Sequence, residues 1–232
     1  MLTLEALFLR QGDCELKADL EVPKGITALI GPSGGGKSTL LAGIAGFLRQ
    51  VSGRISFADE DLTDLDPGQR PVSILFQDHN LFPHLTIGQN TGLALRPNLR
   101  LEDKEWARVY ESLDRVGLAG MSGRKPGSLS GGQQSRAALA RVLLADRPVV
   151  LLDEPFAALG PGLRVEMLDL LARTMDRSDK TIVMVTHDPS DAQRVADHVM
   201  FLDAGQVQPP QPTAKIFADP PEALRVYLGQ MD

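Results

Sequence analysis

The sequence predicts an α/β protein whose sheet is mainly parallel. Three short runs of consecutive β-branched and aliphatic residues, at 27–30, 149–152 and 182–185, have the composition of strands covered on both faces. Residues 162–173, between the second and third runs, have apolar positions at helical spacing. Because such helices lie between the apolar strands, a layered α/β architecture is expected.

The length and composition fit one large domain, or one domain that carries a smaller lobe. The chain has 232 residues, enough to bury a substantial core, and its single cysteine, Cys14, cannot form an internal disulfide. The net charge is −6, and Lys and Arg are scattered along the chain. A basic surface for nucleic acid is therefore not expected.

The first residues do not have the pattern expected of a signal peptide. Residues 1–5 lack the basic start and apolar core of a signal peptide. No apolar run approaches the roughly 20 residues that span a bilayer. We therefore expect a cytosolic location, with any role at a membrane arising from docking onto another protein.

A strand, a loop and a helix follow one another in the first part of the chain. The apolar run 27–30 ends in glycine, and residues 38–47 have helical spacing. Between them stand Gly31, Pro32, Ser33, Gly34, Gly35, Gly36, Lys37 and Ser38. This is the P-loop pattern, in which glycines let backbone N–H groups surround phosphates. An ordinary glycine-rich turn is the alternative, and the flanking strand and helix favour the nucleotide site.

Within this loop, two side chains have the expected chemistry. Lys37 should reach the β- and γ-phosphates, and Ser38 should bind Mg²⁺. The helix that follows adds the positive end of its dipole.

Two carboxylates, Asp153 and Glu154, follow the apolar run 149–152. They would lie at the carboxyl end of a sheet strand, beside the P-loop. Asp153 can complete the Mg²⁺ shell, and Glu154 can polarise the water that attacks the γ-phosphate. Without a P-loop, a pair of acids capping the next helix would be the preferred interpretation.

The region from about 85 to 145 loses the strand pattern and indicates helices broken by Pro97, Gly117 and the loop 123–128. Just before a predicted helix at 134–144 stand Leu129, Ser130, Gly131, Gly132 and Gln133. The serine and the glycine amides would form a second anion-binding helix start, able to complete the P-loop site of a second copy. A simple Ser-Gly helix cap is the alternative.

Two further polar residues follow strands. His187 comes after the run 181–185 and could bind the γ-phosphate, although a lone histidine can also be purely structural. Gln77 follows 72–76 and could contact Mg²⁺ or the attacking water. Beyond Gly205 the chain is Pro-rich, with short helices expected at 213–217 and 222–228 and no chemistry assigned to them.

With these residues in this order, the chain resembles the ATP-binding subunits of ABC transporters over nearly its whole length, from Leu2 to Gly229. The resemblance implies a single domain with a P-loop NTPase core, an antiparallel β lobe and an inserted helical lobe. Residues 1–84 and 146–232 would form the RecA-like core with the β lobe. Residues 85–145 would form the helical lobe.

The resemblance also implies an ATPase with ATP and Mg²⁺ as cofactors. The implied catalytic residues are Lys37, Gln77, Glu154 and His187, and the implied metal ligands are Ser38, Gln77 and Asp153. The implied nucleotide-binding residues are Phe8, Gly31, Pro32, Ser33, Gly34, Gly35, Gly36, Lys37, Ser38, Thr39, Ser130, Gly131, Gly132 and Gln133. Phe8 would stack on adenine, or it would be a core phenylalanine.

The implied partners are a second copy, which sandwiches ATP in a homodimer, and integral membrane permease subunits served by a periplasmic solute-binding protein. The chain would be peripheral on the cytoplasmic face of the bacterial inner membrane. Phe82, Pro83 and Leu85 would line the permease-docking groove, unless they are core residues of the lobe.

Within this family, residues 67–101 are similar to the ATPases of bacterial thiamine importers, which implies import of thiamine or a thiamine phosphate. Importers of iron, sulfate, molybdate or polyamines remain alternatives, as does a soluble ABC ATPase that acts on nucleic acid or ribosomes. One position departs from the family: Gly160 stands where an Asp usually helps to join the two subunits.

Overall fold

The computed structural model describes residues 1–175 and 179–229. The chain divides into two units. One, here called the core unit, comprises residues 1–72, 148–154 and 177–232, and the other, the helical unit, comprises 73–147 and 155–176. The two units are described separately below.

The core unit contains the parallel strands that the sequence predicts. They are β3 (Gly25–Ile30), β7 (Val149–Asp153), β8 (Thr181–Val185) and β9 (His198–Asp203). β3 pairs in parallel with β8 on one side and β9 on the other, and β8 pairs in parallel with β7. Every residue of β3 and β8 is buried, as expected for strands covered on both faces.

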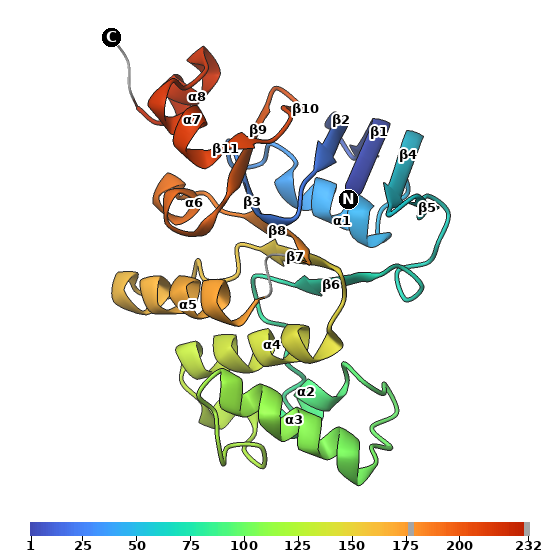
Figure 1. The fold of residues 1–232 in the computed structure, drawn as a ribbon, viewed down its shortest axis with the longest axis vertical. Helices are drawn as coiled ribbons and strands as arrows, with labels where there is room; N and C mark the ends of the chain where they lie inside the picture. Colours follow the sequence, from blue (N-terminus) through green and yellow to red (C-terminus); the bar gives the residue numbers. More distant parts are fainter. Residues whose placement is uncertain (176–178, 230–232) are drawn as a thin grey trace. The chain divides into compact units, whose positions relative to one another are not determined.

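An antiparallel half extends the same sheet. Its strands are β1 (Leu2–Gln11), β2 (Cys14–Val22), β4 (Ser52–Phe57) and β5 (Glu60–Asp61). The short β10 (Gln206–Val207) pairs with both β2 and β9 and so joins the halves, in the order β5-β4-β1-β2-β10-β9-β3-β8-β7 (Figure 1). β11 (Gln211–Pro212) pairs with β9. The antiparallel β lobe of the prediction is this half of the sheet.

Among the residues that the structure describes, four helices belong to the core unit. α1 (Lys37–Ala45) contacts β1 and β7, and a side chain at its Gly43 would meet Leu9 of β1. The others are α6 (Pro189–Val195), α7 (Thr213–Ala218) and α8 (Glu222–Tyr227). Apolar residues of these three helices pack on β3 and β9 in one buried cluster: Ala28, Ile30, Ala192, Val199, Phe201, Ile216 and Leu224. The two tail helices therefore form where the sequence predicts them.

The helical unit is built around α4 (Gly131–Ala145), which contacts the other helices described in this unit. These are α2 (Ile87–Gly92), α3 (Asp103–Arg115) and α5 (Pro161–Thr174), and a 3₁₀ turn occupies Pro126–Ser128. The strand β6 (Val72–Leu75) leads into the unit from the core. The unit is wider than the expected lobe at 85–145, because α5 packs against α4.

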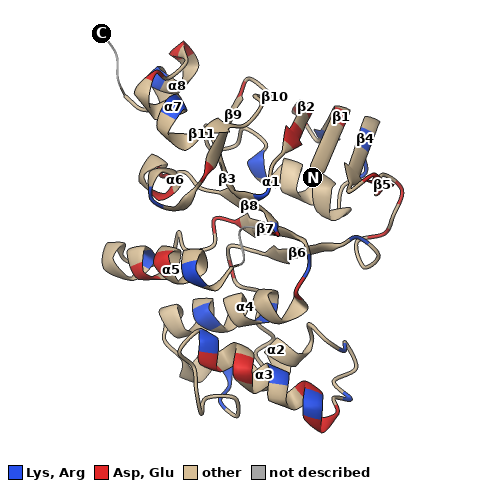
Figure 2. Cartoon of the chain, viewed as in Figure 1, with Lys and Arg blue, Asp and Glu red and all other residues tan. Residues whose placement is uncertain are grey.

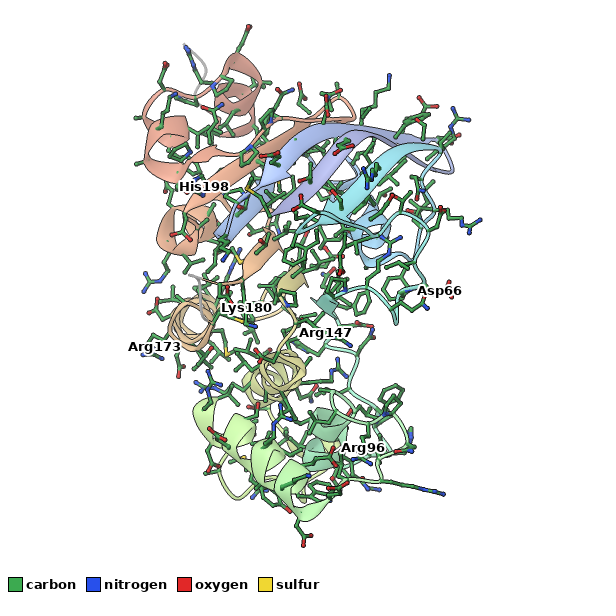
Figure 3. All side chains as sticks on the ribbon, turned by 45° about the vertical axis from the view of Figure 1, so that its right-hand side comes forward. Asp66, Arg96, Arg147, Arg173, Lys180 and His198 are labelled. Atoms are coloured by element: carbon green, nitrogen blue, oxygen red, sulfur yellow. The ribbon has the colours of Figure 1, made fainter. Side chains whose placement is uncertain are left out.

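The surface of the helical unit is highly charged along α3, where acidic and basic residues are interspersed (Figure 2). Arg96, labelled in Figure 3, pairs with Glu102 and Glu105 at the start of that helix. In the described part of the chain, no helix has the length and apolar character needed to cross a membrane.

Candidate functional site

The P-loop connects β3 to α1, and two of its glycines are required by close packing. A Cβ at Gly31 would lie 2.3 Å from the backbone oxygen of Leu202. Gly36, the N-cap of α1, has a φ of +104°, and a Cβ there would lie 3.0 Å from Cys14 Sγ. The loop can therefore follow this path only with glycine at these positions.

Lys37 is enclosed by its own loop. Its Nζ donates hydrogen bonds to the carbonyl oxygens of Gly31 and Pro32, both at 2.8 Å, and the residue is only 6% exposed. Burial lowers the pKa of the ammonium, while the charges of Glu154 and Asp153 raise it. A cation is thus held at the centre of a curled backbone, the arrangement that receives phosphate oxygens.

Asp153 is the last residue of β7, and Ser38 is in the first turn of α1. Ser38 Oγ donates a hydrogen bond to Asp153 Oδ1 at 3.1 Å. Burial raises the pKa of the Asp153 carboxyl, the Ser38 hydrogen bond lowers it, and nearby Glu154 raises it again. A hydroxyl and a desolvated carboxylate side by side are oxygen ligands of the kind that Mg²⁺ binds together with phosphates.

Glu154 and His187 meet at the carboxyl ends of β7 and β8. Glu154 Oε2 lies 2.8 Å from His187 Nδ1. Glu154 has a φ of +44°, and its N–H donates to the carbonyl of Val185, the last residue of β8. A non-glycine residue in this left-handed region costs about 1–3 kcal/mol, a strain found most often at functional sites.

Five of the predicted side chains of the core unit therefore converge. β3, β7 and β8 are adjacent parallel strands, and the residues at or just beyond their carboxyl ends are Lys37, Ser38, Asp153, Glu154 and His187. This edge is where open α/β sheets bind ligands. Thr39, also predicted, lies one residue further into α1, and its Oγ1 donates to Gln11 Oε1 at 3.2 Å.

Phe8 lies on the face of β1 that is turned away from α1, which does not support its predicted adenine contact, and that contact stays a prediction. Along β1, Leu7 and Leu9 are buried, and Leu9 faces Gly43 of α1. Because neighbouring side chains of a strand point to opposite faces, Phe8 lies on the other face, with Arg10 and Lys17 at 5.4 and 5.8 Å from its ring centre. The ring is half-buried, so Phe8 is not a core residue of the β lobe.

Gln11, at the end of β1, was missed by the sequence reasoning. It lies beside α1 through its hydrogen bond with Thr39. The alternation of buried and exposed residues along β1 could have shown that Leu9 and Gln11 share the face turned toward α1.

In the helical unit, Ser130 caps α4. Ser130 Oγ accepts from the N–H of Gln133, and the Gln133 side chain accepts from the Ser130 N–H, which makes a capping box. Gly132 is buried, and a Cβ there would lie 2.6 Å from Leu163 of α5. Ser130 and Gly131 remain exposed at the start of a 15-residue helix. The structure therefore contains the helix cap at Ser130, and the phosphate contact of Ser130 stays a prediction.

The loop that carries Gln77 is tied to the same helix. Gln77 is exposed. Two residues on, His79 Nε2 lies 2.8 Å from Ser135 Oγ, which in turn donates to the carbonyl of Gly131. Arg141 of α4 donates to the carbonyls of His79 and Asn80 at 2.9 and 2.8 Å. The loop after Gln77 and the start of α4 are therefore one hydrogen-bonded assembly, which no sequence motif indicated.

The segment around Phe82, predicted to line a permease-docking groove, is held by hydrogen bonds to one side chain. The buried Asn90 side chain accepts from the N–H of Phe82 and donates to the carbonyls of Phe82, Leu85 and Thr86. Phe82 itself is 47% exposed and lines a hollow with Phe76, Asn80, Leu81 and Arg141. Phe82 is therefore a surface residue of the unit.

Gly160, the position that departs from the family, is the N-cap of α5. It has a φ of −63°, makes no side-chain cap, and has open space around the place of a Cβ. Nothing in the backbone here requires glycine.

Comparison with known proteins gives matches over nearly the whole chain. A family model described as "ABC transporter" matches residues 17–157. The thiamine import ATP-binding protein ThiQ of Cereibacter sphaeroides is 57% identical over 230 residues, covering 99% of this chain and 100% of that protein. ThiQ of Ruegeria sp. (strain TM1040) is 54% identical over 230 residues, with coverage of 99% and 100%.

Solved structures resemble the chain as well. A dimeric post-hydrolysis state of the ATP-binding cassette MJ0796 bound to ADP and Pi has a TM-score of 0.78 and 29% identity, covering 92% of this chain and 99% of that one. A second dimeric structure of MJ0796, described as a bacterial ABC transporter cassette, has a TM-score of 0.77 with the same identity and coverage. The mixed α/β cassette expected from the sequence is thus confirmed.

Proposed function

Because the chain belongs to the ABC transporter family, we propose that it is the ATP-hydrolysing subunit of a membrane importer for thiamine or a thiamine phosphate. The observation that carries the ATPase assignment is the convergence of Lys37, Ser38, Asp153, Glu154 and His187 at one edge of the sheet. The solute is inferred from the relatives, which are named thiamine import ATP-binding proteins and are matched over their full length.

The P-loop binds the phosphates of ATP. Lys37 exchanges its two carbonyl partners for β- and γ-phosphate oxygens, and the backbone N–H groups of the loop surround them. A buried ammonium with few waters interacts more strongly with an anion than an exposed one does.

Ser38 and Asp153 fit Mg²⁺. Both are oxygen donors already in contact, and burial, which raises the pKa of the Asp153 carboxyl, leaves a carboxylate that a cation would stabilise. Gln77, in the helical unit, stays a predicted ligand. Ser38 and Asp153 would hold the ion, which would offset the negative charge of the phosphates.

Glu154 acts on the attacking water. Its carboxylate accepts a proton as the water oxygen bonds to the γ-phosphorus, and the bond to the β–γ bridging oxygen breaks to release ADP. His187 holds this carboxylate through Nδ1 and can donate to the γ-phosphate from its other ring nitrogen when that nitrogen is protonated.

A second copy completes each site. The exposed Ser130 and Gly131, with the N–H groups at the start of α4, would contact the γ-phosphate held by the P-loop of the other copy. The dimeric state of the MJ0796 cassette supports this arrangement. Permease subunits would dock at the hollow beside Phe82 on the cytoplasmic face of the inner membrane, and a periplasmic protein would deliver the solute.

The proposal is tested by uptake in the source bacterium. The gene is deleted in a thiamine auxotroph, and uptake of labelled thiamine is measured after restoring either the wild-type chain or the Glu154→Gln variant. Only the wild-type chain should restore uptake. Labelled iron, sulfate, molybdate and putrescine are measured in parallel, and loss of one of these with thiamine uptake intact would overturn the thiamine assignment.

A further inference from the structure

The C-terminal helix α8 reaches the catalytic edge through one hydroxyl. Tyr227 Oη donates a hydrogen bond to the backbone carbonyl of His187 at 2.9 Å, across 40 positions of sequence. We propose that Tyr227 is a positioning residue for ATP hydrolysis, which fixes the backbone of His187 so that its imidazole stays against Glu154. This inference rests on the proposed ATPase function.

The anchor at the other end of this contact is firm. Leu224 of α8 is fully buried in the cluster that includes Ile30 and Phe201. The Tyr227 ring packs against the Phe201 ring, with centres 5.9 Å apart. α8 is therefore fixed on β3 and β9, the strands next to the P-loop. The Tyr227 hydroxyl is thus held in place by the packing of its helix and ring.

The hydroxyl is suited to donate. Burial raises the pKa of Tyr227, and the nearby charges of Asp188 and Glu154 raise it further, while a hydrogen bond with the backbone of Gly31 lowers it. The group therefore stays protonated at neutral pH. Through the carbonyl of His187, this side chain contacts the segment after β8.

The receiving segment needs such an anchor. The His187 side chain is 51% exposed, and its ring is placed by the contact with Glu154. Thr186, the residue before His187, donates a 2.7 Å hydrogen bond from Oγ1 to Asp191 Oδ2. This bond orders the backbone before His187 but does not involve the His187 carbonyl. Tyr227 supplies the contact to that carbonyl.

Tyr227→Phe isolates the hydroxyl, because it keeps the ring and its packing. The chain has two tyrosines, so Tyr110→Phe, on the exposed face of α3, is the matched control. In the transporter assembled with its permease, Tyr227→Phe should lower kcat about 2- to 12-fold, the range for loss of one neutral hydrogen bond, with KM for ATP unchanged. Tyr110→Phe should leave both constants unchanged.

A second readout does not depend on hydrolysis. The chain has four histidines, and the Cε1–H resonance of His187 is assigned in the NMR spectrum by its loss in His187→Ala. Tyr227→Phe should shift this resonance in the nucleotide-free chain and leave those of His79 and His84 in place. Tyr110→Phe should shift none of them.

The inference is overturned if Tyr227→Phe leaves kcat and the His187 resonance unchanged, or if it raises KM with kcat intact. It is also overturned if it only lowers the thermal unfolding midpoint. Failure of the proposed function looks different, because the wild-type complex itself would then not hydrolyse ATP.

Discussion

His187 Nδ1 lies 2.8 Å from Glu154 Oε2, although the two residues are 33 positions apart in the sequence. Parallel pairing of β7 with β8 brings them together, because Asp153 pairs with Val185, Glu154 comes directly after Asp153, and His187 comes two residues after Val185. The contact gives the proposed general base a fixed orientation before nucleotide arrives. The first prediction tests that base.

Glu154→Gln should retain ATP binding and lose hydrolysis. Lys37, Ser38 and Asp153 are unchanged, whereas the amide cannot accept the proton of the attacking water, so kcat should fall by about 10² to 10⁴. Phosphate release and equilibrium binding of labelled ATP measure the two effects. Glu21→Gln, an exposed acid of β2, is the control. Hydrolysis by Glu154→Gln at the wild-type rate would show that another group is the base.

Gly31→Ala should destabilise the core unit. The new Cβ would lie 2.3 Å from the backbone oxygen of Leu202, and the sheet must shift to accept it. Overpacking of this kind costs about 1–3 kcal/mol of unfolding free energy. Gly68→Ala, which has open space around its Cβ position, should leave urea unfolding almost unchanged. Equal midpoints for the two variants would mean that the loop does not require glycine at position 31.

Two substitutions of Ser130 distinguish its role as a helix cap from a role in binding phosphate. Ser130→Ala removes the side-chain acceptor for the Gln133 N–H and should cost about 0.5–2 kcal/mol of unfolding free energy. Ser130→Asp keeps a capping oxygen but adds a negative charge where the γ-phosphate of the other copy would lie. It should therefore fold normally and lose ATP-dependent dimers, measured by sedimentation in the Glu154→Gln background.

The control for this charge is Gly127→Asp, which places the same carboxylate in open space three residues earlier. That variant should still dimerise with ATP. If Ser130→Asp also dimerises as the wild type does, Ser130 is only a helix cap.

Gly160→Asp should be accepted by the fold and should raise or leave unchanged the ATPase activity of the assembled transporter. Gly160 is the N-cap of α5 with open space around it, so an Asp there supplies a cap and should add about 0.5–1 kcal/mol to the unfolding free energy. Gly160→Asn, which caps without a charge, separates stability from subunit coupling. If Gly160→Asp clearly loses ATPase activity and Gly160→Asn does not, the loop around position 160 does not tolerate a negative charge.

The predictable part of this protein is the part in which function follows from a local pattern. The strand, glycine loop and helix around Lys37 are contiguous, and Asp153 and His187 each follow an apolar run whose end could be located from the sequence. Shared placement of parallel strand ends then explains why these residues meet.

The contacts that escaped prediction join segments with no common pattern. Tyr227 reaches His187 across 40 positions, and His79 reaches Ser135 across 56. Neither partner stands in a recognisable motif with the other. The alternation of side chains along β1 places Phe8 on the face opposite Leu9, and its position as the aromatic residue before the P-loop does not indicate that face.

The central claim is that two copies hold one nucleotide between the P-loop of one and the start of α4 of the other. It is tested by mixing two populations in a Cys14→Ser, Glu154→Gln background, one with Ser33→Cys and the other with Ser130→Cys. Ser33 and Ser130 are both exposed. With Mg²⁺ and ATP, mild oxidation should give a covalent dimer, absent without nucleotide and absent when Ser52→Cys replaces Ser130→Cys. No dimer with ATP, or dimers only within one population, would contradict the account.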